Sequence, residues 1–167
     1  MKAHHLTYIR HGSPLGLARR RRRLAALRGG PPEMTYTDTQ LEFLSAHRWA
    51  VLATGRLDGS PQQAMVGYAL DNEGRVLVLT RSFTAKWRNA LRQPRVSLTV
   101  PDGRRHVVVY GTAEAIDTDP ERAELSADVL AAVRGTERPV PSTIVDWLDE
   151  NRQVVLRITP EKALMHE

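Results

Sequence analysis

One short segment of the sequence gathers residues that suit an anion. Residues 80–89, TRSFTAKWRN, combine three hydroxyl side chains with Arg81, Lys86 and Arg88. The segment lies where a strand-like run gives way to a helical run, and Thr84 is a candidate helix cap. A helix N-terminus offers unpaired N–H groups and the positive end of its dipole, which suit a phosphate. From spacing alone, an ordinary capped helix with solvated basic residues explains the pattern equally well.

Motifs typical of other kinds of site are missing from the sequence. It contains no G-x-S-x-G, G-x-x-x-x-G-K-[ST], G-x-G-x-x-G or H-E-x-x-H pattern. The 6 histidines are scattered and only His4 and His5 are close together, so we expect no metal site. There is no cysteine, which excludes disulfides and a cysteine nucleophile. The carboxylates are spread over turns and helix starts, so the catalytic residues stay unassigned.

The elements that must position this segment form a regular pattern rich in β-structure. Apolar and alternating runs predict six strands, at residues 49–54, 61–70, 75–80, 95–100, 106–116 and 154–158. Helices are predicted near residues 38–47, 85–92 and 144–150, with another opening at residues 119–120. We expect Pro160 to end the last strand and allow a further short strand at residues 163–165. Gly111, inside the long fifth strand, indicates a bulge or a close backbone approach.

Turn signals connect these strands in sequence order. Asp58-Gly59 and the turn at residues 71–74 join the first three strands into an antiparallel meander. Short strands interrupted by a few helices are typical of a closed or nearly closed barrel. The sequence therefore predicts a mainly β fold with helical insertions (α+β), a six-stranded antiparallel split β-barrel.

The positive charge of the chain is concentrated at its N-terminus. Residues 1–33 carry a net charge of +7, whereas residues 34–167 carry −2. We therefore divide the chain into a basic extension (1–36), expected to be disordered, and a cofactor-binding domain (37–167). Such an extension suits nucleic acid or an acidic membrane surface, which we do not expect the domain itself to bind. Synthesis starting at Met34 would remove the extension.

The cellular location follows from what the sequence lacks. No run of 18 apolar residues is present, so we expect no membrane span. The basic N-terminus is not followed by an apolar stretch and a cleavage site, so it is no secretory signal. Together with the absence of cysteine, these features fit a cytoplasmic protein.

Three segments resemble one known family. Residues 79–98, LTRSFTAKWRNALRQPRVSL, look like the signature of the pyridoxamine 5′-phosphate oxidase-like, flavin-binding split-barrel superfamily. Residues 49–60 are similar to its first hairpin, and residues 61–74 to its second strand and turn. The resemblance covers residues 37–165 and is closest to the actinobacterial branch that uses the deazaflavin coenzyme F-420 instead of FMN. It implies a homodimer with each site built between the subunits.

The resemblance also implies roles for particular residues. Lys86 would contact the cofactor phosphate, and the same corner would contribute Thr80, Arg81, Ser82, Arg88 and Asn89. The strand at residues 61–70 would lie along the tricyclic ring and offer main-chain groups to its polar edge, with Gln63, Met65, Val66, Gly67 and Tyr68 as the residues involved. Arg88, Arg92 and Arg95 could meet the oligoglutamate tail of F-420, and Tyr110 and Trp147 could close the site from the second subunit. Without the resemblance, the apolar residues among these would be assigned to packing.

The implied function is hydride transfer between F-420 and a small organic substrate. Hydride transfer needs alignment more than a side-chain base, which agrees with the lack of a catalytic dyad. Three alternatives remain: an FMN-dependent oxidoreductase, a non-catalytic flavin or deazaflavin carrier, and a haem-binding relative. The basic C-terminal motif with which pyridoxamine phosphate oxidases hold pyridoxal phosphate has no counterpart here, which argues against vitamin B6 chemistry.

Overall fold

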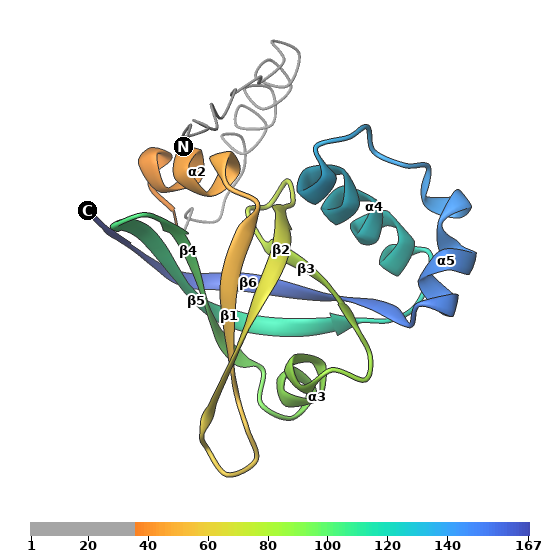
Figure 1. Ribbon diagram of the computed structural model, residues 1–167, viewed down its shortest axis with the longest axis horizontal. Coiled ribbons are helices and arrows are strands. Elements are labelled where there is room, and N and C mark those ends of the chain that lie inside the picture. Colours follow the sequence, from red (N-terminus) through yellow and green to blue (C-terminus); the bar gives the residue numbers. More distant parts are fainter. Residues whose placement is uncertain (1–35) are drawn as a thin grey trace, which may run out of the picture.

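A computed structural model describes residues 36–167, so the predicted basic extension, apart from Tyr36, and the predicted start at Met34 lie outside the described residues. Six antiparallel strands close into a barrel in the order β1-β2-β3-β6-β5-β4 (Figure 1). The strands are β1 (Trp49–Gly55), β2 (Pro61–Leu70), β3 (Val76–Arg81), β4 (Arg95–Asp102), β5 (Arg105–Ile116) and β6 (Gln153–His166). The predicted fold class and the opening meander β1-β2-β3 are confirmed.

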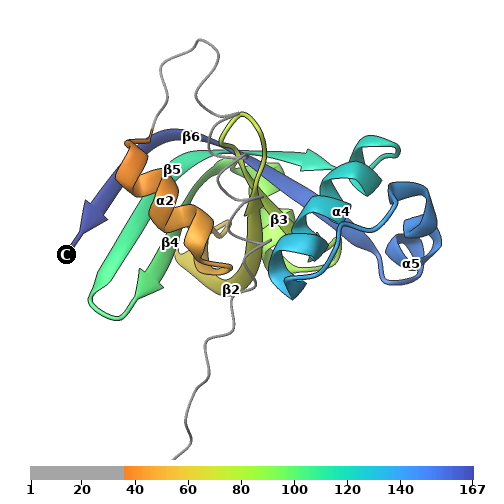
Figure 2. The same ribbon diagram turned by 90° about the horizontal axis from the view of Figure 1, so that it is seen from above.

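Helices cover both ends and one side of this barrel. They are α2 (Asp38–Ala46), α3 (Ala85–Arg92), α4 (Glu121–Arg134) and α5 (Val145–Glu150), with a short 3-10 turn η1 (Pro141–Thr143) before α5. Figure 1 shows α2 at one end of the barrel and α3 at the other. Figure 2 shows α4 and α5 lying outside the wall. The helix α2 begins with a capping box, in which Thr37 and Gln40 exchange side-chain and main-chain hydrogen bonds.

Strand alternation places one set of apolar side chains inside the barrel. Leu52, Val78, Leu98, Val107 and Leu156 are fully buried there. α2 and α3 close the interior with Leu44 and Trp87 among others. A second apolar cluster lies between α4 and the outer surface of β3 and β6. No helix within residues 36–167 is both long and apolar enough to cross a membrane.

The last strand differs from the prediction. β6 does not end at Pro160 but continues to His166, pairing with β5 along its length. The register shifts between Tyr110 and Gly111, so that Gly111 faces Pro160 while Tyr110 faces Lys162. A Cβ on Gly111 would lie 2.3 Å from the Thr159 carbonyl oxygen, so the predicted close approach at this glycine is confirmed. Proline is tolerated in a strand at such an irregularity because the ladder is interrupted there.

Candidate functional site

The predicted anion corner lies where β3 leads into α3. Thr80 is buried at the end of β3, and its hydroxyl lies 3.1 Å from that of Thr84. Thr84 occupies the N-cap position of α3, but its hydroxyl donates to the Arg81 carbonyl (2.9 Å) and caps no N–H of the helix. Thr84 therefore stands at the predicted cap position, but its side chain makes no capping hydrogen bond. Since Thr84 leaves the first-turn N–H groups of α3 uncapped, they stay able to bind an anion.

Lys86 brings a positive charge into the first turn of α3. Its side chain is half-buried, and burial lowers the pKa of its ammonium below the ordinary value of 10.5. No carboxylate of residues 36–167 lies within 4.0 Å of that ammonium. Partial burial of an ammonium without a counter-charge is unfavourable, so a bound anion would relieve it.

The other predicted residues of this corner point in different directions. Arg81 is exposed and lies over the ring of Phe83, 5.9 Å from its centroid. Ser82 is half-exposed, and its N–H donates to the Arg152 carbonyl (3.0 Å). Arg88 is exposed on α3. Asn89 is buried instead, which excludes it from the outer surface of the corner.

The predicted ring-binding strand β2 divides between the two faces of the barrel wall. Gln63 and Met65 are exposed on the outer face, with 61 % of Met65 accessible. Val66 and Tyr68 point inside, where the Tyr68 hydroxyl donates to the Leu44 carbonyl (2.6 Å). The side chains of Val66 and Tyr68 therefore belong to the core and cannot line an external ligand, because neighbouring residues of a strand face opposite sides.

Gly67 faces outward, but a helix covers it. A Cβ on Gly67 would lie 2.6 Å from Cγ2 of Val133 in α4. The missing side chain therefore admits Val133, and the close approach predicted for a flat ring is taken by α4 at this position. Met65 and Gln63, farther from α4 along β2, remain open.

The main chain of β2 is open along one edge. β3 pairs with β2 only from Tyr68 to Leu70, whereas β2 extends back to Pro61. The Tyr68 N–H donates to the Arg48 carbonyl on the β1 side (3.1 Å). Main-chain N–H and C=O groups point to alternate sides along an antiparallel strand. The groups of Met65 and Gln63 therefore point away from β1, toward the gap left where β2 is not paired with β3. This edge, residues 61–67 of β2, is called the open edge below.

The open edge and the anion corner lie at the same end of the barrel. β2 and β3 are antiparallel, so the start of β2 and the end of β3 lie at the same end of the barrel. α3 packs against β2 at that end. The open edge, with its hydrogen-bonding main chain, and the corner, with Lys86 and the N-terminus of α3, therefore lie at the same end of the barrel.

A surface cavity of about 320 Å³ opens beside the β1–β2 hairpin. Ala53, Ser97 and Tyr110 form its floor as successive cross-strand neighbours on β1, β4 and β5. Of its lining residues, the sequence had suggested only Tyr110 and Arg95, because the pairing of β1 with β4 that assembles the floor leaves no local signal. The complete lining is Ala53, Thr54, Gly55, Gly59, Pro61, Arg95, Val96, Ser97, Tyr110, Gly111 and Glu161.

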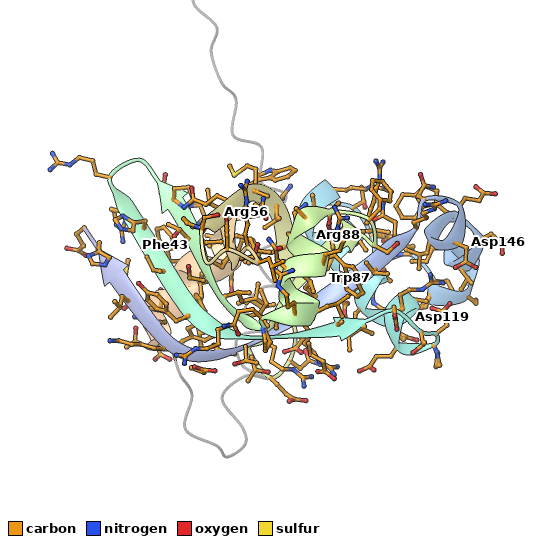
Figure 3. The ribbon with its side chains drawn as sticks, turned by 90° about the horizontal axis from the view of Figure 1, so that it is seen from below. Phe43, Arg56, Trp87, Arg88, Asp119 and Asp146 are labelled. Carbon is orange, nitrogen blue, oxygen red and sulfur yellow. The ribbon has the colours of Figure 1, made fainter. Side chains whose placement is uncertain are left out.

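Charge is divided between two regions of the molecule. Residues 47–112, which include the hairpin and α3, hold ten Lys and Arg against four Asp and Glu. Residues 113–167, which include α4 and α5, hold six against twelve. Figure 3 shows Asp119 and Asp146 at the α4–α5 end, away from Arg56 and Arg88. Within residues 36–167, no three His, Asp or Glu side chains are grouped to hold a metal ion.

The sequence signature of one family spans the whole described region. Residues 36–167 match the family described as pyridoxamine 5′-phosphate oxidase. The chain belongs to this family. One relative, an F-420-dependent biliverdin reductase of Mycobacterium tuberculosis that uses the reduced coenzyme, is 34% identical over 130 residues, covering 77% of this chain and 86% of the relative.

Two further similarities are to a second reductase and to a solved structure. A 5a,11a-dehydrotetracycline/5a,11a-dehydrooxytetracycline reductase of Streptomyces rimosus is 30% identical over 125 residues, covering 68% of this chain and 84% of the relative. The crystal structure of a conserved hypothetical protein of Mycobacterium tuberculosis superposes with a TM-score of 0.68 at 23% identity, covering 83% of this chain and 89% of that one. The last similarity supports the barrel fold alone.

Proposed function

We propose that this protein is an oxidoreductase that uses coenzyme F-420 to reduce a small organic substrate. The observation that carries the proposal is Lys86, a half-buried ammonium without a carboxylate partner beside the uncapped N-terminus of α3. The 34% identical biliverdin reductase, which depends on F-420, supports the choice of coenzyme. The cytoplasm remains the predicted location.

The residues of the anion corner fit a phosphate group. Lys86 would provide the charge, and the first-turn N–H groups of α3 would provide donors. Ser82 is half-exposed and Arg81 is exposed beside the N-terminus of α3, and they would add a hydroxyl and a second cation. Thr80 would act indirectly, because its buried hydroxyl lies against Thr84.

The open edge fits the polar rim of a flat heterocycle. The main chain of Gln63 and Met65 faces the gap, and the exposed Met65 side chain offers an apolar surface beside it. When bound, the coenzyme supplies the hydride chemistry. The protein's own task is to hold the coenzyme and the substrate in the correct relative orientation and to exclude water. It therefore needs no acid–base pair.

Exposed arginines near α3 suit an acidic tail. Arg88 and Arg95 are exposed, and no carboxylate of residues 36–167 forms an ion pair with either. The sequence predicts that Arg92 also meets this tail, but its guanidinium donates to the Gly55 carbonyl (3.0 Å). We therefore assign the oligoglutamate tail to Arg88 and Arg95 and give Arg92 a different role.

We also propose that two copies associate through the outer face of the barrel. Five uncharged side chains are successive cross-strand neighbours across β2, β1, β4, β5 and β6 and point outward; they are Met65, Val51, Thr99, Val108 and Leu164. We call this row the outer ridge. A largely apolar strip suits the self-complementary contact of a twofold dimer, and it would bring the partner's surface next to the open edge, which includes Met65.

A side-by-side titration of the purified protein tests the assignment. We expect F-420 to bind with micromolar or tighter affinity and more tightly than FMN, and the reduced coenzyme to be oxidised with members of a panel of enones, quinones and nitro compounds. Tighter binding of FMN would move the protein to the flavin branch of the family. Tight F-420 binding with no turnover across the panel would indicate a carrier.

A further inference from the structure

A chain of side-chain hydrogen bonds crosses the α3 end of the barrel. Asn89 of α3 donates through Nδ2 to the Thr54 hydroxyl of β1 (3.0 Å). That hydroxyl donates to Oε1 of Gln62 on β2 (3.0 Å). Nε2 of Gln62 then donates to the main-chain carbonyl of Gln63 (2.8 Å). We call this series the relay; it links α3, which carries Lys86, to the open edge of β2.

Arg92, at the α3 end of the relay, fixes which atom donates and which accepts in every bond of the relay. Nη2 of Arg92 donates to Oδ1 of Asn89 (3.0 Å) and to the Gly55 carbonyl (3.0 Å). A guanidinium has no acceptor, so it forces the amide oxygen of Asn89 toward itself and the amide nitrogen toward Thr54. The Thr54 oxygen must then accept, which leaves its single proton for Gln62.

Burial makes the central members sensitive to substitution. Thr54 is 3% exposed and Asn89 is 6% exposed, so neither can exchange its partner for bulk water. A buried hydroxyl that both accepts and donates has few replacements, and loss of one bond leaves its neighbour unsatisfied. Thr54 is the only member that contacts both α3 and β2 side chains directly.

The position of these bonds matches the two parts of the proposed cofactor site. Asn89 follows Lys86 by three residues, one turn of α3, so the bond to Asn89 sets where the phosphate anchor stands relative to β1. Gln63 is on the open edge, and its carbonyl accepts the last bond of the relay. We infer that Thr54 is a positioning residue that fixes the distance between the phosphate anchor on α3 and the ring-binding edge of β2. The inference rests on the proposed function.

The test compares a ligand that must reach both parts with one that reaches only the edge. The first is F-420, and the second is its fragment that ends at the ribityl chain and lacks the phosphate. Thr54→Val removes both hydrogen bonds with little change of volume, and Thr54→Ser keeps them. Thr118→Val, at an exposed position before α4, is the matched control. Dissociation constants are measured by fluorescence titration, and melting temperatures of the unliganded variants report stability.

The expected pattern is specific to positioning. Thr54→Val should weaken F-420 about tenfold and the fragment less than twofold, while Thr54→Ser and Thr118→Val bind both as the wild type does. Adding Thr54→Val to Lys86→Ala should cause a smaller further loss than Thr54→Val causes in the wild type, because the strongest of the contacts that Thr54 positions is already removed.

Other outcomes separate this inference from the proposed function. Equal weakening of both ligands by Thr54→Val, or unchanged F-420 binding, would overturn the positioning role while leaving the proposed function intact. If the wild type prefers FMN, the same comparison is made with FMN and riboflavin, and the same criteria apply. If the wild type binds neither pair, the proposed function and this inference are both wrong.

Discussion

Lys86 combines a positive charge, partial burial and a position in the first turn of α3. Replacing it with alanine removes a charge-assisted contact to the proposed phosphate, so we expect Lys86→Ala to weaken cofactor binding by about 1.5–3 kcal/mol. Isothermal titration calorimetry measures the change. Arg104→Ala, which removes an exposed cation at the β4–β5 turn, is the control and should leave binding unchanged. An unaltered dissociation constant for Lys86→Ala would exclude this residue from the site.

The pH dependence of binding gives an independent check on the same side chain. Burial lowers the pKa of Lys86, so the free protein loses this charge before the pH reaches the ordinary 10.5. A bound phosphate would raise that pKa again, and affinity should therefore fall as the pH rises through the lowered value. Lys86→Arg keeps its charge over this range, so its affinity should fall less. Parallel profiles for the two proteins would contradict the prediction.

At this scale the charged and hydroxyl residues carry a stronger sequence signal for a binding site than the apolar ones. Hydroxyls and cations clustered at a strand–helix junction carry their own chemical signal, which is why the sequence predicts an anion site around Lys86. The side chains of Met65, Val66, Gly67 and Tyr68 cannot all face one ligand, because a strand alternates its faces. Strand alternation alone would have reduced that list to Met65 and Gly67. The predicted contact of this strand with the ring is made by main-chain groups and stays a prediction.

At the scale of elements, the contact between α4 and β2 decides how much of β2 stays accessible. Gly67→Ala places a methyl group 2.6 Å from Val133, so we expect a loss of about 1–3 kcal/mol in the free energy of unfolding. Urea denaturation measures this loss. The double variant Gly67→Ala/Val133→Ala makes room for the methyl group and should recover stability relative to the sum of the single variants. Additive losses would show that the two residues do not touch.

The elements themselves were largely predictable, and the exceptions have physical causes. α3 and β2 have the predicted bounds, because Pro61 and Pro94 mark their limits locally. The continuation of β6 past Pro160 depends on the irregular pairing with Gly111, which is 49 positions earlier in the chain. A contact between such distant residues leaves no trace in the local pattern around the proline.

For the whole molecule, the outer ridge predicts the state of assembly. Val108→Glu introduces a charge in the middle of the ridge, and we expect the dimer dissociation constant to rise by about 100-fold or more because two carboxylates would be buried without partners. Sedimentation velocity over a range of concentrations measures it. Val140→Glu, at an exposed apolar position outside the ridge, should leave association unchanged. A Val108→Glu protein that remains dimeric would show that another surface forms the contact.

The closure of the barrel was predicted from the number and spacing of the strands, but its strand order was not. Only the completed order brings β1 beside β4 and creates the cavity floor. The split between β2 and β3 likewise depends on how far their ladder extends. Sites formed by non-local pairing of this kind become visible only once the fold is known.

The unequal charge of residues 47–112 and 113–167 predicts an electric dipole moment for the part of the molecule that the structure describes. An anionic coenzyme approaching through solution would experience a torque and an attraction toward the hairpin and α3 before any contact forms, and repulsion from the α4–α5 side. Productive encounters would then be more frequent than random collision allows, and added salt would reduce that advantage. For a coenzyme that diffuses between enzymes, this orientation before contact would set the rate at which the protein binds each new molecule.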